Sequence, residues 1–281
     1  MRGKFWLVFS VMSCLAYSFS PFVWGGNADA QLKKAIMYAT GEGVPQDSSE
    51  AAKWFRVAAE QGHAEAQFFL GHVYDEGVGV PQDSSEAVKW LRMAAEQGHA
   101  EAQFSLGIKY NNGRGVPQNS REAAKWYRMA AEQGLADAQL NLGIMYVNGT
   151  GVPQNSSEAV KLIRMAAEQS DAEAQFSLGV IYANGRGVPQ NSREAVKWFR
   201  MAAEQGHARA QNNIGAMYLT GGGVPLDLIQ AYMWSNLAST SGGYEPASEN
   251  REIAASKMTA AQIAEAQRLS SNWKPKKQYQ R

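Results

Sequence analysis

Residues 64–99 read AEAQFFLGHVYDEGVGVPQDSSEAVKWLRMAAEQGH, and this stretch decides the fold. In its first half, Gln67, Leu70 and Tyr74 recur at the spacing that places side chains on one face of a helix. Two glycines and Pro81 follow, and these residues stop a helix because glycine takes the left-handed conformation cheaply and proline cannot sit in a helix interior. The first half therefore predicts one helix that ends in a turn.

The second half of the same stretch predicts a second helix. Asp83 is followed three residues later by Glu86, a spacing typical of a helix N-terminus. Trp90 lies on the apolar face of this helix, and Gly98 is expected to end it. The 36 residues together predict a helix–turn–helix hairpin.

The same pattern returns at a fixed interval of 36 residues, which is typical of a repeat array rather than of one large core. The turn motif GVPQ begins at residues 43, 79, 115, 151 and 187, with the variant GVPL at 223. The aromatic position of the first helix holds Tyr38, Tyr74, Tyr110, Tyr146, Tyr182 and Tyr218. Because the turn recurs together with these packing residues, we interpret it as a hinge between helices and not as a ligand loop.

The consensus A-x-A-Q-x-x-L-G-x-x-Y-x-x-G-x-G-V-P-Q, followed by A-x-x-W and A-A-E-Q-G, resembles the Sel-one-like repeat family, which is related to tetratricopeptide repeats. The resemblance implies an all-α fold, a right-handed α/α solenoid of helix–turn–helix repeats with C-terminal capping helices. It divides the chain into six repeats and a C-terminal segment: 28–63, 64–99, 100–135, 136–171, 172–207 and 208–243, then a capping segment over 244–273 and a basic tail over 274–281.

The first residues differ in composition from the repeats. A short basic start, MRGK, precedes FWLVFSVMSCLAYSFS, which carries no charge. This pattern is typical of a secretory signal over residues 1–27. An uncleaved N-terminal anchor and a lipoprotein processed at Cys14 are the alternatives. All three predict an exported protein, in the periplasm or cell envelope or secreted.

The composition argues against several kinds of chemistry. The net charge is +1, which gives no electrostatic basis for nucleic-acid binding. Cys14 is the only cysteine, and the histidines at 63, 99 and 207 occupy one repeat position and are interpreted as helix-start residues. We therefore expect no metal, no cofactor and no enzymatic activity. Some cysteine-rich relatives have been described as β-lactam-related hydrolases, so a cell-wall hydrolase stays an alternative.

A surface that varies between repeats is the remaining candidate for function. We expect a concave face, lined by the first helices, to hold a protein or an extended peptide, because asparagine amides both donate to and accept from a peptide backbone. A secreted factor that interacts with a host is a further alternative. The candidate residues on this face are Phe69, His72, Ser105, Ile108, Asn112, Asn141, Ile144, Asn148, Ser177, Val180, Asn184 and Asn213.

Overall fold

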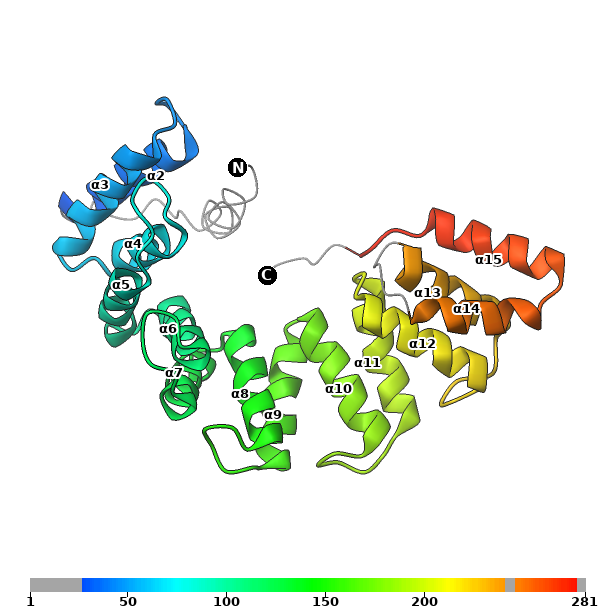
Figure 1. The fold of residues 1–281 in the computed structure, drawn as a ribbon. Helices are drawn as coiled ribbons and strands as arrows, with labels where there is room; N and C mark the ends of the chain where they lie inside the picture. Colours follow the sequence, from blue (N-terminus) through cyan, green and yellow to red (C-terminus); the bar gives the residue numbers. More distant parts are fainter. Residues whose placement is uncertain (1–26, 241–245, 277–281) are drawn as a thin grey trace. The chain divides into compact units, whose positions relative to one another are not determined.

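The computed structural model describes residues 27–240 and 246–276, and within these residues it contains helices and no strands. The chain divides into two compact units, one ending at Leu135 and the other beginning at Ala136. Each unit contains three helical hairpins, and the second also contains two C-terminal helices (Figure 1). The predicted signal segment lies outside the described residues, apart from Asn27. Among the described helices, none has both the length and the apolar character needed to cross a membrane.

The helices of the first unit follow the predicted hairpins. They are α2 (Asn27–Thr40), α3 (Ser48–Glu60), α4 (Ala64–Glu76), α5 (Ser84–Glu96), α6 (Ala100–Asn112) and α7 (Ser120–Glu132). Those of the second unit are α8 (Ala136–Asn148), α9 (Ser156–Glu168), α10 (Ala172–Asn184), α11 (Ser192–Glu204), α12 (Ala208–Thr220), α13 (Leu228–Thr240), α14 (Ala247–Ser256) and α15 (Ala260–Asn272).

The helix boundaries are set by the residues that the sequence pattern indicated. The Asp83 carboxylate accepts hydrogen bonds from the backbone N–H groups of Ser85 and Glu86 and so caps α5. His63 caps α4 through a hydrogen bond from the Ala66 N–H, as expected for a helix-start residue. Gly98 follows the end of α5 with a φ of 91°, the left-handed conformation of a helix C-terminus.

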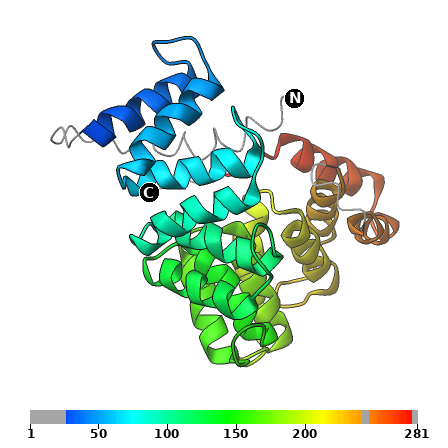
Figure 2. The ribbon, with the colours of Figure 1, turned by 60° about the vertical axis from the view of Figure 1, so that its left-hand side comes forward.

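Packing within a hairpin depends on close contact between its two helices. A Cβ placed on Gly107 of α6 would lie 2.6 Å from the Tyr127 ring of α7, and one on Gly71 would lie 2.7 Å from Leu91. Within each unit, a first helix also packs against the second helix of the repeat before it, for example α4 against α3 and α10 against α9 (Figures 1 and 2). The stacking of hairpins within each unit confirms the predicted solenoid architecture.

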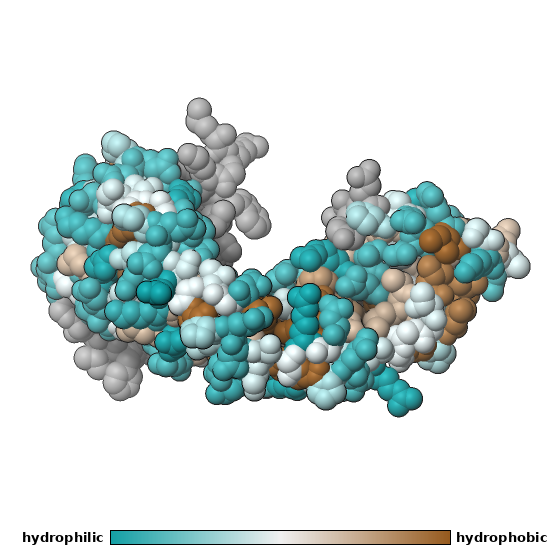
Figure 3. All heavy atoms as spheres, turned by 60° about the horizontal axis from the view of Figure 1, so that its bottom comes forward, coloured by the Kyte–Doolittle hydropathy of each residue, from teal (hydrophilic) through white to brown (hydrophobic). Residues whose placement is uncertain are grey.

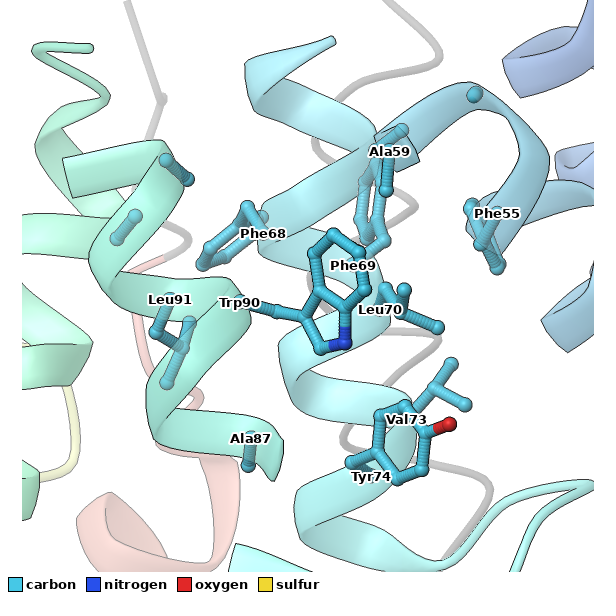
Figure 4. Close-up of a cluster of buried hydrophobic side chains, with 14 of the residues drawn as sticks. Phe55, Ala59, Phe68, Phe69, Leu70, Val73, Tyr74, Ala87, Trp90 and Leu91 are labelled. Carbon is cyan, nitrogen blue, oxygen red and sulfur yellow. The ribbon is translucent and has the colours of Figure 1, made fainter. Parts of the chain in front are cut away.

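Aromatic side chains fill the space between repeats of the first unit (Figure 4). Phe69 and Leu70 of α4 are fully buried, and Trp90 of α5 is 6% exposed. The Phe69 and Phe55 rings lie 5.4 Å apart, which joins α4 to the preceding repeat. The recurring aromatic positions are therefore core residues, as the sequence indicated.

Two C-terminal helices cover the last hairpin. The Thr259 side chain and the Gln262 side chain form a reciprocal capping box at the start of α15. Helices α14 and α15 both pack on α13, where Leu237 is 3% exposed. The predicted capping segment therefore has the expected role in the second unit.

The start of the basic tail expected over 274–281 is held against α11. The Lys276 backbone N–H donates to the Glu204 carbonyl at 2.8 Å, and its Nζ lies 2.6 Å from the Glu204 carboxylate. The start of this tail is thus attached to the end of α11, because both a backbone bond and an ion pair hold it. Residues 277–281 lie outside the described residues.

Candidate functional site

The candidate site is the face of the first helices that varies from repeat to repeat. In the first unit it includes Phe69 and His72 on α4, and Ser105, Ile108 and Asn112 on α6. Phe69 is 2% exposed, since its ring packs on Phe55 and Phe68, and it cannot contact a partner. The expectation that Phe69 belongs to the binding surface is therefore wrong. The smaller side chain of Ser105 at the same repeat position is half-buried.

His72 lies at the junction of two repeats. Its ring packs edge-on against Phe68 at 4.6 Å, and Phe68 also stacks on His99 at 4.7 Å. Burial among these rings lowers the pKa of His72 to about 4, against the opposing attraction of Asp75. His72 is consequently neutral at pH 7, and its ring acts as a packing group with one polar edge.

A buried ion pair lies directly beside His72, and sequence reasoning missed it. Lys109 of α6, 5% exposed, contacts the carboxylate of Asp75 on α4, which is 8% exposed. Arg114 adds a weaker contact to the same carboxylate at 3.6 Å. The pair joins the second and third repeats, because the two charges are largely withdrawn from water and depend on each other.

One signal in the sequence could have indicated this pair. The repeat position of Lys109 is otherwise apolar in the described repeats, where it holds Met37, Val73, Met145, Ile181 and Met217. A lysine at a position that faces the core needs a buried partner, and the preceding repeat supplies Asp75. A lysine at a repeat position that is otherwise apolar thus predicts an acidic partner in a neighbouring repeat.

Ser105 and His72 are the one pair on this face that resembles part of a hydrolytic site. The Ser105 Oγ lies 3.5 Å from the His72 Nε2. This distance exceeds the range of about 2.6–3.2 Å typical of a nucleophile and its base. Asp75 does not hold the imidazole in place, since its hydrogen bond comes from Lys109. The geometry therefore does not favour the hydrolase alternative.

The candidate face of the second unit is polar and aliphatic. Ile144 of α8 is 38% exposed, and the helix ends at the exposed Asn148. Ser177 and Val180 of α10 are half-buried, and that helix ends at the exposed Asn184. Asn213 of α12 is also half-buried.

Not every asparagine on this face offers a free amide. The Asn141 amide group donates to the Asp137 carbonyl of its own helix at 2.8 Å, so one side of this amide is already used. Asn148 and Asn184 occupy the last residue of their helices, next to a left-handed glycine. The structure therefore gives these two, together with Ile144, the best access to a partner in the second unit.

The surface drawn in Figure 3 shows hydrophobic residues mostly as small patches surrounded by hydrophilic ones. Among the residues that the structure describes, no group of histidine, cysteine or acidic side chains could hold a metal ion. A surface of this kind suits recognition by scattered polar and aliphatic contacts.

Comparison with known proteins identifies the family. The family model described as Sel1 repeat matches residues 28–63, 64–99, 100–135, 136–171, 172–207 and 208–243. The chain therefore belongs to the Sel1 repeat family, and the resemblance seen in its consensus is confirmed. No curated protein matches the chain.

Two solved structures share both fold and sequence with the chain. A protective antigen present in uropathogenic Escherichia coli strains, which displays an SLR fold, is 36% identical with a TM-score of 0.81, and the match covers 97% of this chain and 56% of the antigen. A Sel1 repeat protein from Oxalobacter formigenes is 37% identical with a TM-score of 0.72, and the match covers 80% of this chain and 64% of that protein. This chain thus spans less than two thirds of the length of either structure.

Membership of this family defines a class of function. Sel1 repeats form a scaffold that is typical of proteins mediating protein interactions, and scaffolds of this kind are generally non-catalytic. The fold and the family agree with the expected role in protein binding at this coarse level.

Proposed function

We propose that this chain is an exported, non-enzymatic scaffold that binds a protein or an extended peptide on the varied face of its first helices. One observation carries the proposal. At equivalent positions of an otherwise constant hairpin, the exposed or half-buried residues change from repeat to repeat, as His72, Ile108, Ile144 and Val180 show.

The candidate residues of the second unit suit an extended peptide, because such a chain advances about 3.3 Å per residue and leaves its backbone amides open to hydrogen bonds. Asn148 and Asn184 could each donate to and accept from its backbone, and Ile144 could contact its side chains.

The proposal is tested by capture of partners with matched variants. The purified chain is compared with a variant carrying Asn148→Ala, Ile144→Ala and Asn184→Ala, and with a control carrying Lys161→Ala and Lys197→Ala on the second helices. Both control lysines are exposed in helix α9 or α11. A partner from envelope extract that binds the parent and the control but not the face variant supports the proposal. A partner set that is unchanged in the face variant refutes this face as the site.

Export is a separate part of the proposal, and it rests on the charge-free segment after MRGK. Cell fractionation with mass spectrometry of the N-terminus tests it. A protein found in the periplasm, the envelope or the culture medium supports export, and recovery of the chain with an intact N-terminus in the cytoplasm contradicts it. Recovery from the medium alone would favour the alternative of a secreted host-directed factor.

A further inference from the structure

The segment that follows α15 shows how an extended basic chain can bind to the end of a second helix. Glu204 is the last residue of α11, so its carbonyl is one of the four that no N–H group within the helix can reach. The Lys276 backbone N–H donates to this carbonyl at 2.8 Å, and the Lys276 Nζ lies 2.6 Å from the Glu204 carboxylate. One lysine thus contacts both the backbone and the side chain of Glu204.

The residues before this lysine cover the glycine that ends the same repeat. A Cβ placed on Gly206 would lie 3.7 Å from Pro275 and 3.8 Å from the Trp273 ring, which is ordinary van der Waals contact. Glu204 is half-buried, and its side chain is 30% exposed. The segment therefore contacts both ends of the Glu-Gln-Gly corner that residues 204–206 form.

The Glu-Gln-Gly corner recurs in the first unit, as residues 60–62 at the end of α3 and residues 96–98 at the end of α5. Among residues 27–240 and 246–276, no atom lies within 4 Å of a Cβ placed on Gly62 or Gly98, in contrast to Gly206. The glutamate and the glutamine of both corners are exposed, and neither glutamate has an ion pair within the described ranges. The first unit thus presents two open copies of a surface that is covered in the second.

The backbone of the open corners has the same conformation as that of the covered one. The glycine φ is 87° at Gly62, 91° at Gly98 and 93° at Gly206, and each glycine N–H donates at 3.0 Å to the alanine carbonyl three residues earlier. The glutamate carbonyl and carboxylate therefore stand in the same local frame at each corner. The negative end of the helix dipole adds to the glutamate charge, so each corner favours a cation.

We propose that the two open corners of the first unit bind an extended segment of a partner protein in which a proline and a lysine follow an aromatic residue, as in residues 273–276. The lysine N–H would donate to the carbonyl of Glu60 or Glu96, and its ammonium group would pair with the carboxylate. The proline and the aromatic ring would cover Gly62 or Gly98. An acidic segment would be repelled by both the carboxylate and the helix end.

These corners belong to second helices, so the proposal is independent of the varied face of the first helices. The face variant with Asn148→Ala, Ile144→Ala and Asn184→Ala should bind the corner probe as the parent does. Failure of one proposal therefore leaves the other in place.

The experiment titrates labelled peptides with the purified full chain and follows fluorescence anisotropy at pH 7. The probe is fluorescein-Gly-Gly-Trp-Lys-Pro-Lys-amide, and the control, fluorescein-Gly-Gly-Pro-Lys-Trp-Lys-amide, has the same composition and charge in another order. We expect the probe to bind at least about fivefold more tightly than the control, because the control places its lysine and proline out of register with the corner. Equal binding of the two peptides overturns the proposal, as does the lack of saturable probe binding up to about 1 mM.

Variants connect probe binding to the two corners. The variant carrying Glu60→Lys and Glu96→Lys replaces an attraction with a repulsion at both corners and should weaken binding about tenfold or more. The control carries Glu42→Lys and Glu76→Lys in the same unit, where Glu76 is the last residue of a first helix. It has the same net charge and should weaken binding by at most about twofold, because exposed charges outside the corners are screened by salt. Equal effects of the two variants refute the assignment.

A second copy of the chain is the alternative occupant, because its residues 273–276 carry the same chemistry. Sedimentation velocity at increasing protein concentration distinguishes the two. A monomer at all concentrations supports a partner protein. A dimer that is lost both in the Glu60→Lys and Glu96→Lys variant and in a chain ending at Asn272 would assign the corners to self-association and overturn the proposal of a partner protein.

Discussion

The ion pair between Asp75 and Lys109 gives the sharpest test of how these repeats are joined. Other repeats show which apolar residues can replace the two charges. The position of Asp75 is occupied by Val147 two repeats later, and the position of Lys109 is occupied by Met145 one repeat later. Lys109→Met leaves Asp75 with only the exposed Arg114 at 3.6 Å and should cost about 2–4 kcal/mol. Asp75→Val leaves the buried Lys109 charge without its partner and should cost about 3–5 kcal/mol.

The stability change of the double variant should not equal the sum of the changes in the two single variants. Replacing both charges with apolar residues removes the cost of burying them, so its stability should equal or exceed that of the parent by up to about 4 kcal/mol. The coupling energy of the cycle should then be at least about 5 kcal/mol, the sum of the two smallest single losses. Urea unfolding followed by circular dichroism gives the stabilities, and hydrogen exchange of α4 and α6 locates the effect. A double variant that is destabilised by the sum of the two single effects would refute the reasoning.

Three further perturbations follow from the structure. The pKa of His72 is about 4 in the folded chain and about 6.5 in the unfolded chain. Between these pH values only the unfolded chain protonates this histidine, so the free energy of unfolding falls as the pH drops from about 6.5 to 4. The loss should reach at most about 3 kcal/mol, and His72→Ile should flatten this part of the stability–pH curve measured by urea unfolding; a curve unchanged by the substitution would contradict the assignment. Gln175→Met should destabilise the chain by about 1–3 kcal/mol more than Gln211→Met, since among residues 27–240 and 246–276 the Gln175 amide is hydrogen-bonded at both ends and the Gln211 amide at its N–H end alone; equal thermal shifts would argue against this. Ser170 has a φ of 71°, so Ser170→Gly should stabilise the chain by about 1 kcal/mol, and a lower melting temperature would show that the left-handed backbone costs nothing there.

The repeat frame was predictable from the sequence because each of its residues has a local physical role. Asp83 caps a helix, Gly98 ends one, and Tyr74 and Trp90 fill the space between hairpins. These roles recur at one interval, so each repeat supports the assignment of the others. The frame is thus encoded redundantly, and sequence reasoning recovers it.

Contacts between repeats were predicted less well, because they depend on residues that differ between copies. Phe69 was assigned to the surface by analogy with Ser105 and Asn141, but a phenyl ring at this position reaches the Phe55 ring of the preceding repeat. The role of Lys109 was missed, since the sequence alone does not show that α4 places Asp75 against it. In both cases, the size or charge of one side chain decides whether the residue at that repeat position is buried between repeats or exposed.

The departures from the frame, as well as the frame itself, indicate where binding should be sought. A stack of hairpins needs the apolar contacts and caps that recur, and it does not need a buried ion pair or an unpaired amide oxygen. Each of these two features costs free energy that an apolar residue or one further glutamine would avoid. The ion pair recovers this cost within the chain, because Asp75 and Lys109 satisfy each other. Among residues 27–240 and 246–276, the Gln211 oxygen has no such partner, so its cost is not recovered by a contact within the described part of the chain.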